Sequence, residues 1–124
     1  SEFIENNSDD EALQALITPF AVAIERLSDV TEFVIGAAAE DKNAIGAASV
    51  EYLELFGLTA YAYMWARMAA VAAPKVAGDT SGFYDAKLRT ANFFFSRLLP
   101  RSVSLSESIR SGSNDMMSLD VEAF

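Results

Sequence analysis

Residues 44–73 form the segment that most constrains the fold, because they read as one helix that is apolar on opposite sides. A helix that is apolar on both sides has to be covered on both sides. We therefore expect a central helix, ending before Pro74, with other helices packed around it. Its two apolar series at helical spacing are Tyr52, Phe56, Thr59, Tyr63, Ala66 and Ala70 on one side, and Leu58, Tyr61, Trp65, Met68 and Ala72 on the other.

The stretch Leu55 to Ala73 is long enough to raise a membrane span as an alternative. Arg67 interrupts it, and Glu51 and Glu54 come shortly before it. Charges inside a membrane-spanning segment are costly, and the flanking segments are amphipathic. The sequence therefore favours a buried helix of a bundle, without a membrane partner.

The preceding segment reads as one amphipathic helix of about thirty residues. Ser8-Asp9-Asp10-Glu11 has the pattern of a capping box, so we expect the helix to begin there. Pro19 should kink the helix, because proline lacks a backbone donor and crowds the preceding turn. A helix that begins at Thr18-Pro19 is the alternative. The longer, kinked helix is favoured because its apolar stripe continues through the proline.

Short breaks divide the rest of the chain. The polar residues 40–43 are brief enough to predict an antiparallel return, and Val76 to Gly82 form the main loop. A third helix should start near Phe83 and be kinked or ended by Pro100, and a short helix should span Ser102 to Arg110. The predicted fold is all-α: an antiparallel up-down bundle of three long helices plus a short C-terminal fourth.

The chain of 124 residues suits a single domain, which we place at residues 8–119. Residues 1–7 are expected to be a disordered start or one introduced by cloning, with Ser1-Glu2-Phe3 the candidate non-native piece. The apolar run Met116 to Leu119 is expected to dock on the bundle, and residues 120–124 to fray. The first residues lack the basic and apolar regions of a signal peptide, so we expect none to be removed.

The composition excludes several classes of function. A net charge of −9 argues against a nucleic-acid partner, which usually requires a basic surface. The absence of Cys removes thiolate chemistry and fits a reducing, cytoplasmic location, and the absence of His removes the commonest metal ligand. No glycine-rich phosphate loop is present. We therefore expect no metal, no cofactor and no catalytic residue in this chain.

Few residues could carry chemistry. Glu51 and Glu54 lie about one turn apart, but a solvated start to the second helix explains them better than an acid–base pair. Arg67 lies in the apolar part of the same helix, four residues after Tyr63, and a buried guanidinium there needs an acid or the tyrosine ring as its partner. An Arg that reaches the surface is the favoured interpretation. An independent enzyme could use only these residues and Lys87.

The third helix carries a candidate docking surface. Arg89, Phe93 and Arg97 are spaced by four, so they share one stripe opposite the expected core. In the run Phe93-Phe94-Phe95, we expect Phe95 inside, Phe94 at the border and Phe93 among the arginines. Together with the second helix, this stripe predicts an interface made by Leu58, Tyr61, Trp65, Arg67, Arg89, Phe93 and Arg97.

Four short motifs follow one another along the chain: Tyr52-Leu53-Glu54-Leu55-Phe56-Gly57 with Trp65-Ala66-Arg67-Met68-Ala69, then Phe83 to Phe94, Leu98-Leu99-Pro100, and Met116-Met117-Ser118-Leu119. In this order they resemble the acyl-CoA dehydrogenase C-terminal-like domain, including its subgroup acting on 3-methylmercaptopropionyl-CoA. Asn92 departs from the pattern, which has Arg there. The resemblance covers nearly the whole chain.

The resemblance implies a C-terminal helical extension of an FAD-dependent acyl-CoA dehydrogenase-like enzyme, an oxidoreductase of fatty acid metabolism. In such enzymes the flavin site and the catalytic carboxylate belong to upstream domains, so no catalytic residue carries over. The domain would serve inter-domain packing or dimerisation, with the upstream domains and a second copy as partners. The alternative is a free-standing bundle that binds an acyl chain or acyl-CoA between its helices.

Overall fold

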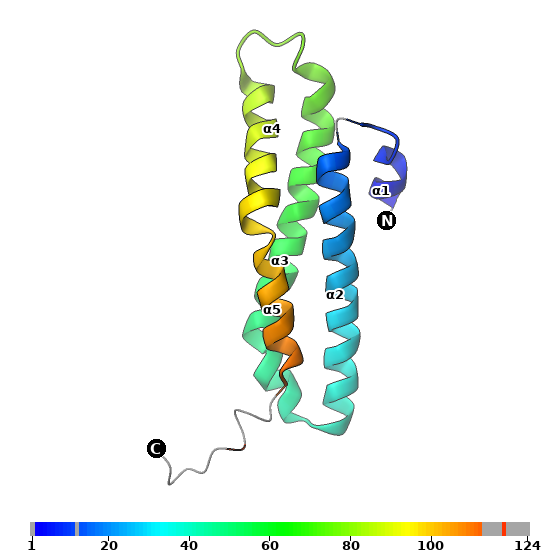
Figure 1. The fold of residues 1–124 in the computed structure, drawn as a ribbon, viewed down its shortest axis with the longest axis vertical. Helices are drawn as coiled ribbons and strands as arrows, with labels where there is room; N and C mark the ends of the chain where they lie inside the picture. The colour runs from blue at the N-terminus through cyan, green and yellow to red at the C-terminus, as the bar shows by residue number, and fades with distance from the viewer. Residues whose placement is uncertain (1, 12, 113–117, 119–124) are drawn as a thin grey trace.

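The computed structural model describes residues 2–11, 13–112 and 118, and these residues form a helical bundle (Figure 1). The long helices α2 (Gln14–Glu40) and α3 (Asn43–Ala72) run antiparallel, joined by a tight turn at residues 41–42. A third rod follows a loop after the 3₁₀ turn η1 (Ala73–Lys75). That rod consists of α4 (Phe83–Phe93), the π-helical turn η2 (Phe94–Leu98) and α5 (Arg101–Arg110).

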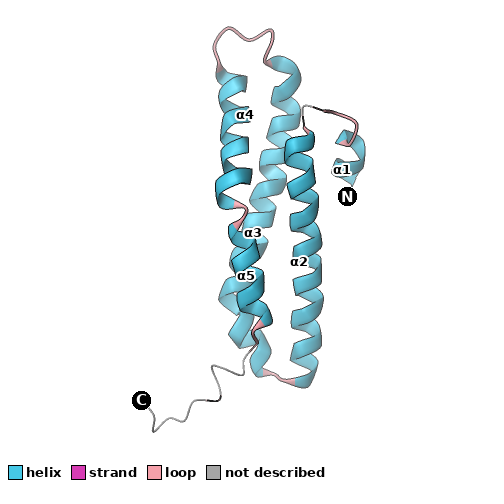
Figure 2. Cartoon of the chain, in the orientation of Figure 1, coloured by secondary structure: helices cyan, strands magenta, loops and turns pink. Residues whose placement is uncertain are grey.

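The described residues are helices and connecting loops (Figure 2), which confirms the predicted all-α bundle. α3 packs against α2, α4 and α5, and is therefore the central helix, as expected. It ends where predicted, since Pro74 falls in the 3₁₀ turn that follows. The short fourth helix also forms, with Pro100 at its N-cap and Gly112, in the left-handed region at φ 73°, just beyond its end.

The start of the chain differs from both expectations for the first helix. Residues expected to be disordered form a short helix, α1 (Glu2–Asn7), whose Phe3 ring meets the ring of Phe20 edge-on at 6.1 Å. Ser8 caps no helix start; its hydroxyl donates to Glu5 O and closes α1. α2 begins at Gln14, with Leu13 at the N-cap and no side-chain cap. The predicted capping box and the alternative start at Thr18 are therefore both wrong, and α2 continues through Pro19.

The buried face of α3 consists mainly of small side chains. Alanine allows neighbouring backbones to approach closely, whereas larger side chains hold helices further apart. The larger core side chains come from α2 and from the third rod, including Phe20, Phe94 and Leu99. The buried residues of α3 are Ala44, Ala48, Leu55, Thr59, Ala62, Ala66, Ala69 and Ala72.

The turn η2 explains why the three consecutive phenylalanines depart from the predicted pattern. Phe95 is buried and Phe93 is exposed, as expected, but Phe94 is also buried, at 4% exposure. Leu99 N donates to Phe94 O at 2.9 Å, five residues back, which makes the turn wider than an α-helical one. The wider turn lets Phe94 and Phe95 enter the core together, with their rings edge-on at 5.7 Å.

Two polar contacts join helices across the bundle. Arg26 of α2 donates to Ser102 of α5, and the hydroxyls of Thr31 and Tyr52 lie 2.7 Å apart between α2 and α3. No buried side-chain nitrogen or oxygen of the described residues lacks a hydrogen-bond partner. The expected docking of the run Met116 to Leu119 and the fraying of residues 120–124 concern a part of the chain that, apart from Ser118, lies outside the described residues.

Candidate interaction surface

The side of α3 opposite its alanine-rich face is apolar and open to solvent. Its members succeed one another at steps of three or four residues, so they form a single stripe along the helix. Leu53 is 72% exposed and Tyr61 is 64% exposed. No charged residue belongs to this stripe. We call it the outer face of α3: Val50, Leu53, Gly57, Tyr61, Met64, Met68 and Val71.

This outer face corrects the prediction that α3 is covered on both sides. The chain covers the face that carries alanine and Leu55, and leaves the opposite face open. The two predicted apolar series are each split by this arrangement. In the first series, Thr59 and Ala66 are buried, but Phe56 is exposed. In the second series, Leu58 and Trp65 are partly buried against the core, but Tyr61 is exposed.

Sequence reasoning missed Val50, Leu53, Met64 and Val71 as surface residues, although their spacing was visible. The signal was a charge-free stripe at steps of three and four residues between Gly46 and Val71. The helix buries mainly small side chains on the side where its neighbouring helices pack against it.

Gly57 lies in the middle of the outer face. A Cβ atom placed on it would meet nothing within 4 Å, so no contact inside the chain requires a glycine there. Glycine in a helix interior costs about 1 kcal/mol relative to alanine. This residue therefore weakens α3 without a compensating contact among the described residues.

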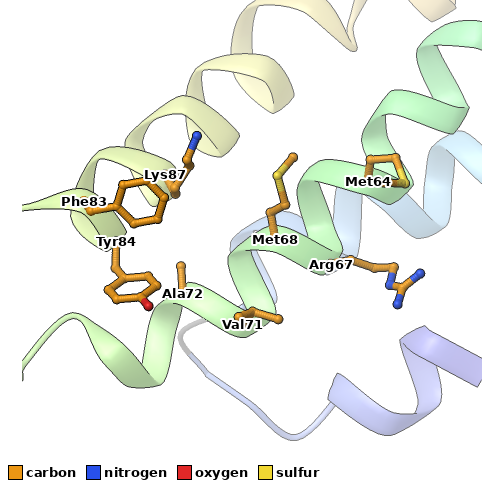
Figure 3. A pocket seen from close by; sticks show the side chains of 8 residues that line it. All are labelled: Met64, Arg67, Met68, Val71, Ala72, Phe83, Tyr84 and Lys87. Carbon is orange, nitrogen blue, oxygen red and sulfur yellow. The ribbon is translucent and has the colours of Figure 1, made fainter. Parts of the chain in front are cut away.

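An apolar groove of about 430 Å³ lies between the C-terminal half of α3 and the start of α4 (Figure 3). Met68, Val71 and Ala72 line its α3 side, and Phe83, Tyr84 and Lys87 line its α4 side. The ammonium of Lys87 lies 5.2 Å from the centre of the Phe83 ring. Because Met68 and Val71 also belong to the outer face, the groove and the outer face form one continuous apolar surface.

Arg67 borders this surface but is not buried, contrary to the premise that its guanidinium would need a buried partner. Its Cζ lies 5.5 Å from the centre of the Tyr63 ring, one of the two partners considered. Figure 3 shows the guanidinium turned away from the side chains of α4. The favoured interpretation, an arginine that reaches the surface, describes this geometry.

The docking stripe predicted for the third helix lies on α4 and η2, separate from the outer face of α3. Phe93 is 56% exposed, and Arg89 and Arg97 are exposed beside it. Arg89 Nε is 2.8 Å from Asp85 Oδ2, an exposed ion pair on the same helix. Phe93 and Arg89 line a groove of about 390 Å³ between α4 and α2, together with Leu16 and Pro19. The predicted interface residues that are exposed therefore lie on two different surfaces, and the other two, Leu58 and Trp65, pack partly buried against the core.

Of the residues considered for chemistry, Arg67 and Lys87 line the same groove and Arg67 lies against Tyr63, whereas the acidic pair lies apart from them. Glu51 is half-buried and Glu54 exposed, while Lys87 lies in the groove at the far end of α3. Within residues 2–11, 13–112 and 118, no group of three or more acidic side chains could hold a metal ion. No helix among the same residues is both long and apolar enough to span a bilayer.

The start of α4 is the one helix start among the described residues with a left-handed glycine at its N-cap, Gly82 at φ 79°. The carboxylate of Asp79 already occupies this helix start. Asp79 Oδ1 accepts from Ser81 Oγ at 2.6 Å and from Ser81 N at 3.0 Å, and Oδ2 accepts from Tyr84 N at 3.2 Å. These hydrogen bonds, led by that of the Ser81 side chain, hold the pKa of Asp79 below its ordinary value of 3.8. A phosphate group would meet this negative charge, so the site does not fit a nucleotide cofactor.

The described residues define a helical bundle domain with an open apolar face on α3 that carries no charge. The sequence model of the family described as "Acetyl-CoA dehydrogenase C-terminal like" matches residues 1–120. The chain belongs to that family, which confirms the resemblance seen in its motifs.

A curated relative supports the assignment. The chain is 31% identical over 121 residues to the broad-specificity linear acyl-CoA dehydrogenase FadE5 of Mycobacterium tuberculosis. The alignment covers 94% of this chain but only 18% of the relative. The chain therefore spans less than one fifth of the length of that dehydrogenase.

Proposed function

We propose that this chain is the non-catalytic C-terminal helical domain of an FAD-dependent acyl-CoA dehydrogenase, and that its role is assembly. Its exposed surfaces would hold the enzyme's other domains, or two copies of the enzyme, together. The observation that carries the proposal is the family match over residues 1–120 combined with the small share of the dehydrogenase relative that the chain covers.

The structure supports the assembly role through what it leaves exposed. Large apolar side chains on α3 and Phe93 on α4 remain open to solvent, although the chain has an independent core. Contiguous exposed apolar surface of this kind is typical of protein–protein contacts. Leu58 and Trp65 of the predicted interface instead pack against the core, so they would support the surface from beneath.

The flavin belongs to the other domains in this proposal. At the start of α4, the Asp79 carboxylate accepts the hydrogen bonds of Ser81 and of Tyr84 N, which disfavours a phosphate there. We derive no catalytic step from the described residues. A cytoplasmic location, which the absence of Cys favours, stays a prediction.

The test compares the reading frame that contains this chain with the 124-residue chain alone. The longer protein is expected to purify with a flavin absorbance spectrum and to oxidise acyl-CoA with an artificial electron acceptor. The 124-residue chain should show neither property. Flavin binding or acyl-CoA oxidation by the chain alone would overturn the proposal, as would a longer protein without dehydrogenase activity.

The groove between α3 and α4 favours a second candidate function, the binding of an acyl chain. Its lining is apolar, and Lys87 could neutralise an anionic group at its edge. Methionine-rich surfaces adapt to flexible ligands, which suits Met64 and Met68. This candidate predicts a rise in the melting temperature of the 124-residue chain with palmitoyl-CoA that Met68→Glu abolishes. The assembly role alone predicts no rise.

A further inference from the structure

We propose that residues 113–120 of this chain dock in a groove between α3 and α5, with Asp120 paired to Arg101. The groove has a volume of about 540 Å³. Its α3 side carries Gly57, Leu58 and Tyr61, and its α5 side carries Arg101 and Leu105. The inference goes beyond the proposed assembly role, because it assigns a segment of the chain itself to a surface that the described residues leave open.

The chain leaves α5 on the side of this groove. Arg101, Leu105, Ser108 and Gly112 follow one another at steps of four, three and four residues, so they share one side of the helix. Gly112 has a φ of 73°, and its N donates to Ile109 O at 3.1 Å. A left-handed glycine in this position ends a helix and turns the chain away from the helix axis. The segment that follows therefore starts next to the groove.

The segment is long enough to follow the groove to its far end. Gly112 and Arg101 are eleven residues apart, which corresponds to about 16 Å along α5. The eight residues from Ser113 to Asp120 span up to about 26 Å when extended. Asp120 can therefore reach the level of Arg101, with length left for the reversal of direction. The family model matches residues 1–120, so the matched domain includes this segment.

The apolar residues of the segment suit the middle of the groove. Met116, Met117 and Leu119 precede Asp120, and methionine side chains fill irregular apolar gaps. On the α3 side, Leu58 offers an apolar wall, and a Cβ atom on Gly57 would meet nothing within 4 Å. The docked segment would fill this open space. It therefore gives a role to a glycine that no contact among the described residues explains.

Charge complementarity selects this segment. Residues 113–124 carry three acidic residues and no basic one, whereas the third rod, residues 83–110, carries five basic and two acidic residues. Arg101 forms no salt bridge with any residue of the described part of the chain. Because α3 and α5 run in opposite directions (Figure 1), Glu54 lines the end of the groove nearer to Gly112, and Arg101 lines the far end. An acidic side chain is therefore repelled at the near end and attracted at the far end, where Asp120 arrives.

The test uses intramolecular cross-linking in a chain that naturally lacks Cys. Met117→Cys combined with Tyr61→Cys places one thiol on the segment and one in the groove. Docking raises the effective concentration of the two thiols, so mild oxidation should close this disulfide at least about tenfold faster than in a control that combines Met117→Cys with Ile35→Cys. Non-reducing electrophoresis of dilute protein and peptide mass mapping measure the product.

Ile35 is the matched control position. Its exposure is 67%, against 64% for Tyr61. It also lies near the end of α5, since the ring centre of Phe33, two residues away, is 5.4 Å from Arg110 Cζ. A segment without a docking site would therefore reach both positions by random collision.

A second set of variants tests the charge pair. Arg101→Glu should slow disulfide formation between Met117→Cys and Tyr61→Cys by about threefold, and adding Asp120→Arg should restore it. Arg97→Glu is the control, because Arg97 is an exposed arginine of the same rod that does not line the groove. Circular dichroism checks that each variant keeps its helical fold.

Equal rates for the Tyr61 and Ile35 pairs would overturn the proposal, as would a charge reversal at Arg101 without effect. Cross-linked dimers in place of the intramolecular product would overturn it too, because the segment would then dock on another copy. None of these results affects the proposed dehydrogenase identity, which depends on the flavin and activity of the longer protein.

Discussion

Arg26 and Ser102, 76 residues apart in the sequence, are joined by a 2.9 Å hydrogen bond from Arg26 Nη1 to Ser102 Oγ. Ser102 is fully buried, with 0% exposure, at the start of α5. A buried hydroxyl requires a hydrogen-bond partner, and an arginine of α2 provides one here. The contact therefore ties the end of the third rod to the first long helix.

Replacing Ser102 by alanine should lower the free energy of unfolding by about 1 kcal/mol, because the Arg26 guanidinium loses its partner. Urea unfolding followed by circular dichroism measures the change. Ser104→Ala is the matched control, since Ser104 is exposed and bonds only to Arg101 O in its own helix. Equal losses in the two variants would contradict a stabilising role for the Arg26 contact.

Leu55 and Leu53 provide a direct comparison of the two faces of α3. Leu55 has 0% exposure and packs with Val30 and Ile109, whereas Leu53 is 72% exposed. We expect Leu55→Ala to cost about 2–5 kcal/mol in unfolding free energy, since it opens a cavity in the core. Leu53→Ala should change it by less than about 0.5 kcal/mol. The experiment is chemical denaturation of both variants at a concentration where the chain is monomeric.

The contact between Thr31 and Tyr52 gives a prediction for the α2–α3 pair. Their hydroxyl oxygens are 2.7 Å apart, and the Thr31 hydroxyl also bonds to Leu27 O. Tyr52→Phe should lower the melting temperature, with a loss of about 1 kcal/mol. Tyr61→Phe removes the same hydroxyl from an exposed ring and should leave the monomer's melting temperature unchanged. A similar drop in both variants would argue against the inter-helix bond.

The Asp79 carboxylate predicts a pH dependence. Its folded pKa lies below the ordinary 3.8, so its stabilising contribution is present above that value and is lost as the pH falls through the folded pKa. Asp79→Ala should therefore be less stable than the natural chain at about pH 6, and the difference should shrink as the pH falls below 3.8 and through the folded pKa. Thermal melts across this range measure it. A difference independent of pH would show that the charge of Asp79 is not what stabilises the start of α4.

Several helix boundaries of the bundle could be predicted from the sequence because the residues that set them act locally. The break before Asn43, the stop at Pro74 and the short helix after Pro100 follow from residues that act within one turn. The capping box failed because Ser8 instead closes α1, whose formation depends on Phe3 packing against Phe20 and Tyr63. A contact between residues far apart in the sequence produces no periodic pattern of apolar residues within the six residues of α1.

The candidate surface was only partly predictable for the same reason. Spacing predicted that Arg89, Phe93 and Arg97 lie away from the core, and they are exposed. Tyr61 belongs to an apolar series that was expected to be covered but is exposed, whereas Leu58 and Trp65 of the same series are drawn partly into the core. Which apolar face of α3 is covered depends on the other helices, and spacing within α3 cannot distinguish two apolar faces. Alanine, which contributes little to hydropathy patterns, marks the covered face.

The π-helical turn at Phe94–Leu98 adds one residue to the third rod without changing which side of the rod faces the core. A turn of this kind holds one residue more than an α-helical turn within about one rotation. Deleting one residue from this turn should therefore restore a regular helix that still presents Ala91, Ser102, Ser106 and Ile109 to the interior. Such a helix would lose the wide turn that lets two consecutive residues, Phe94 and Phe95, enter the core together.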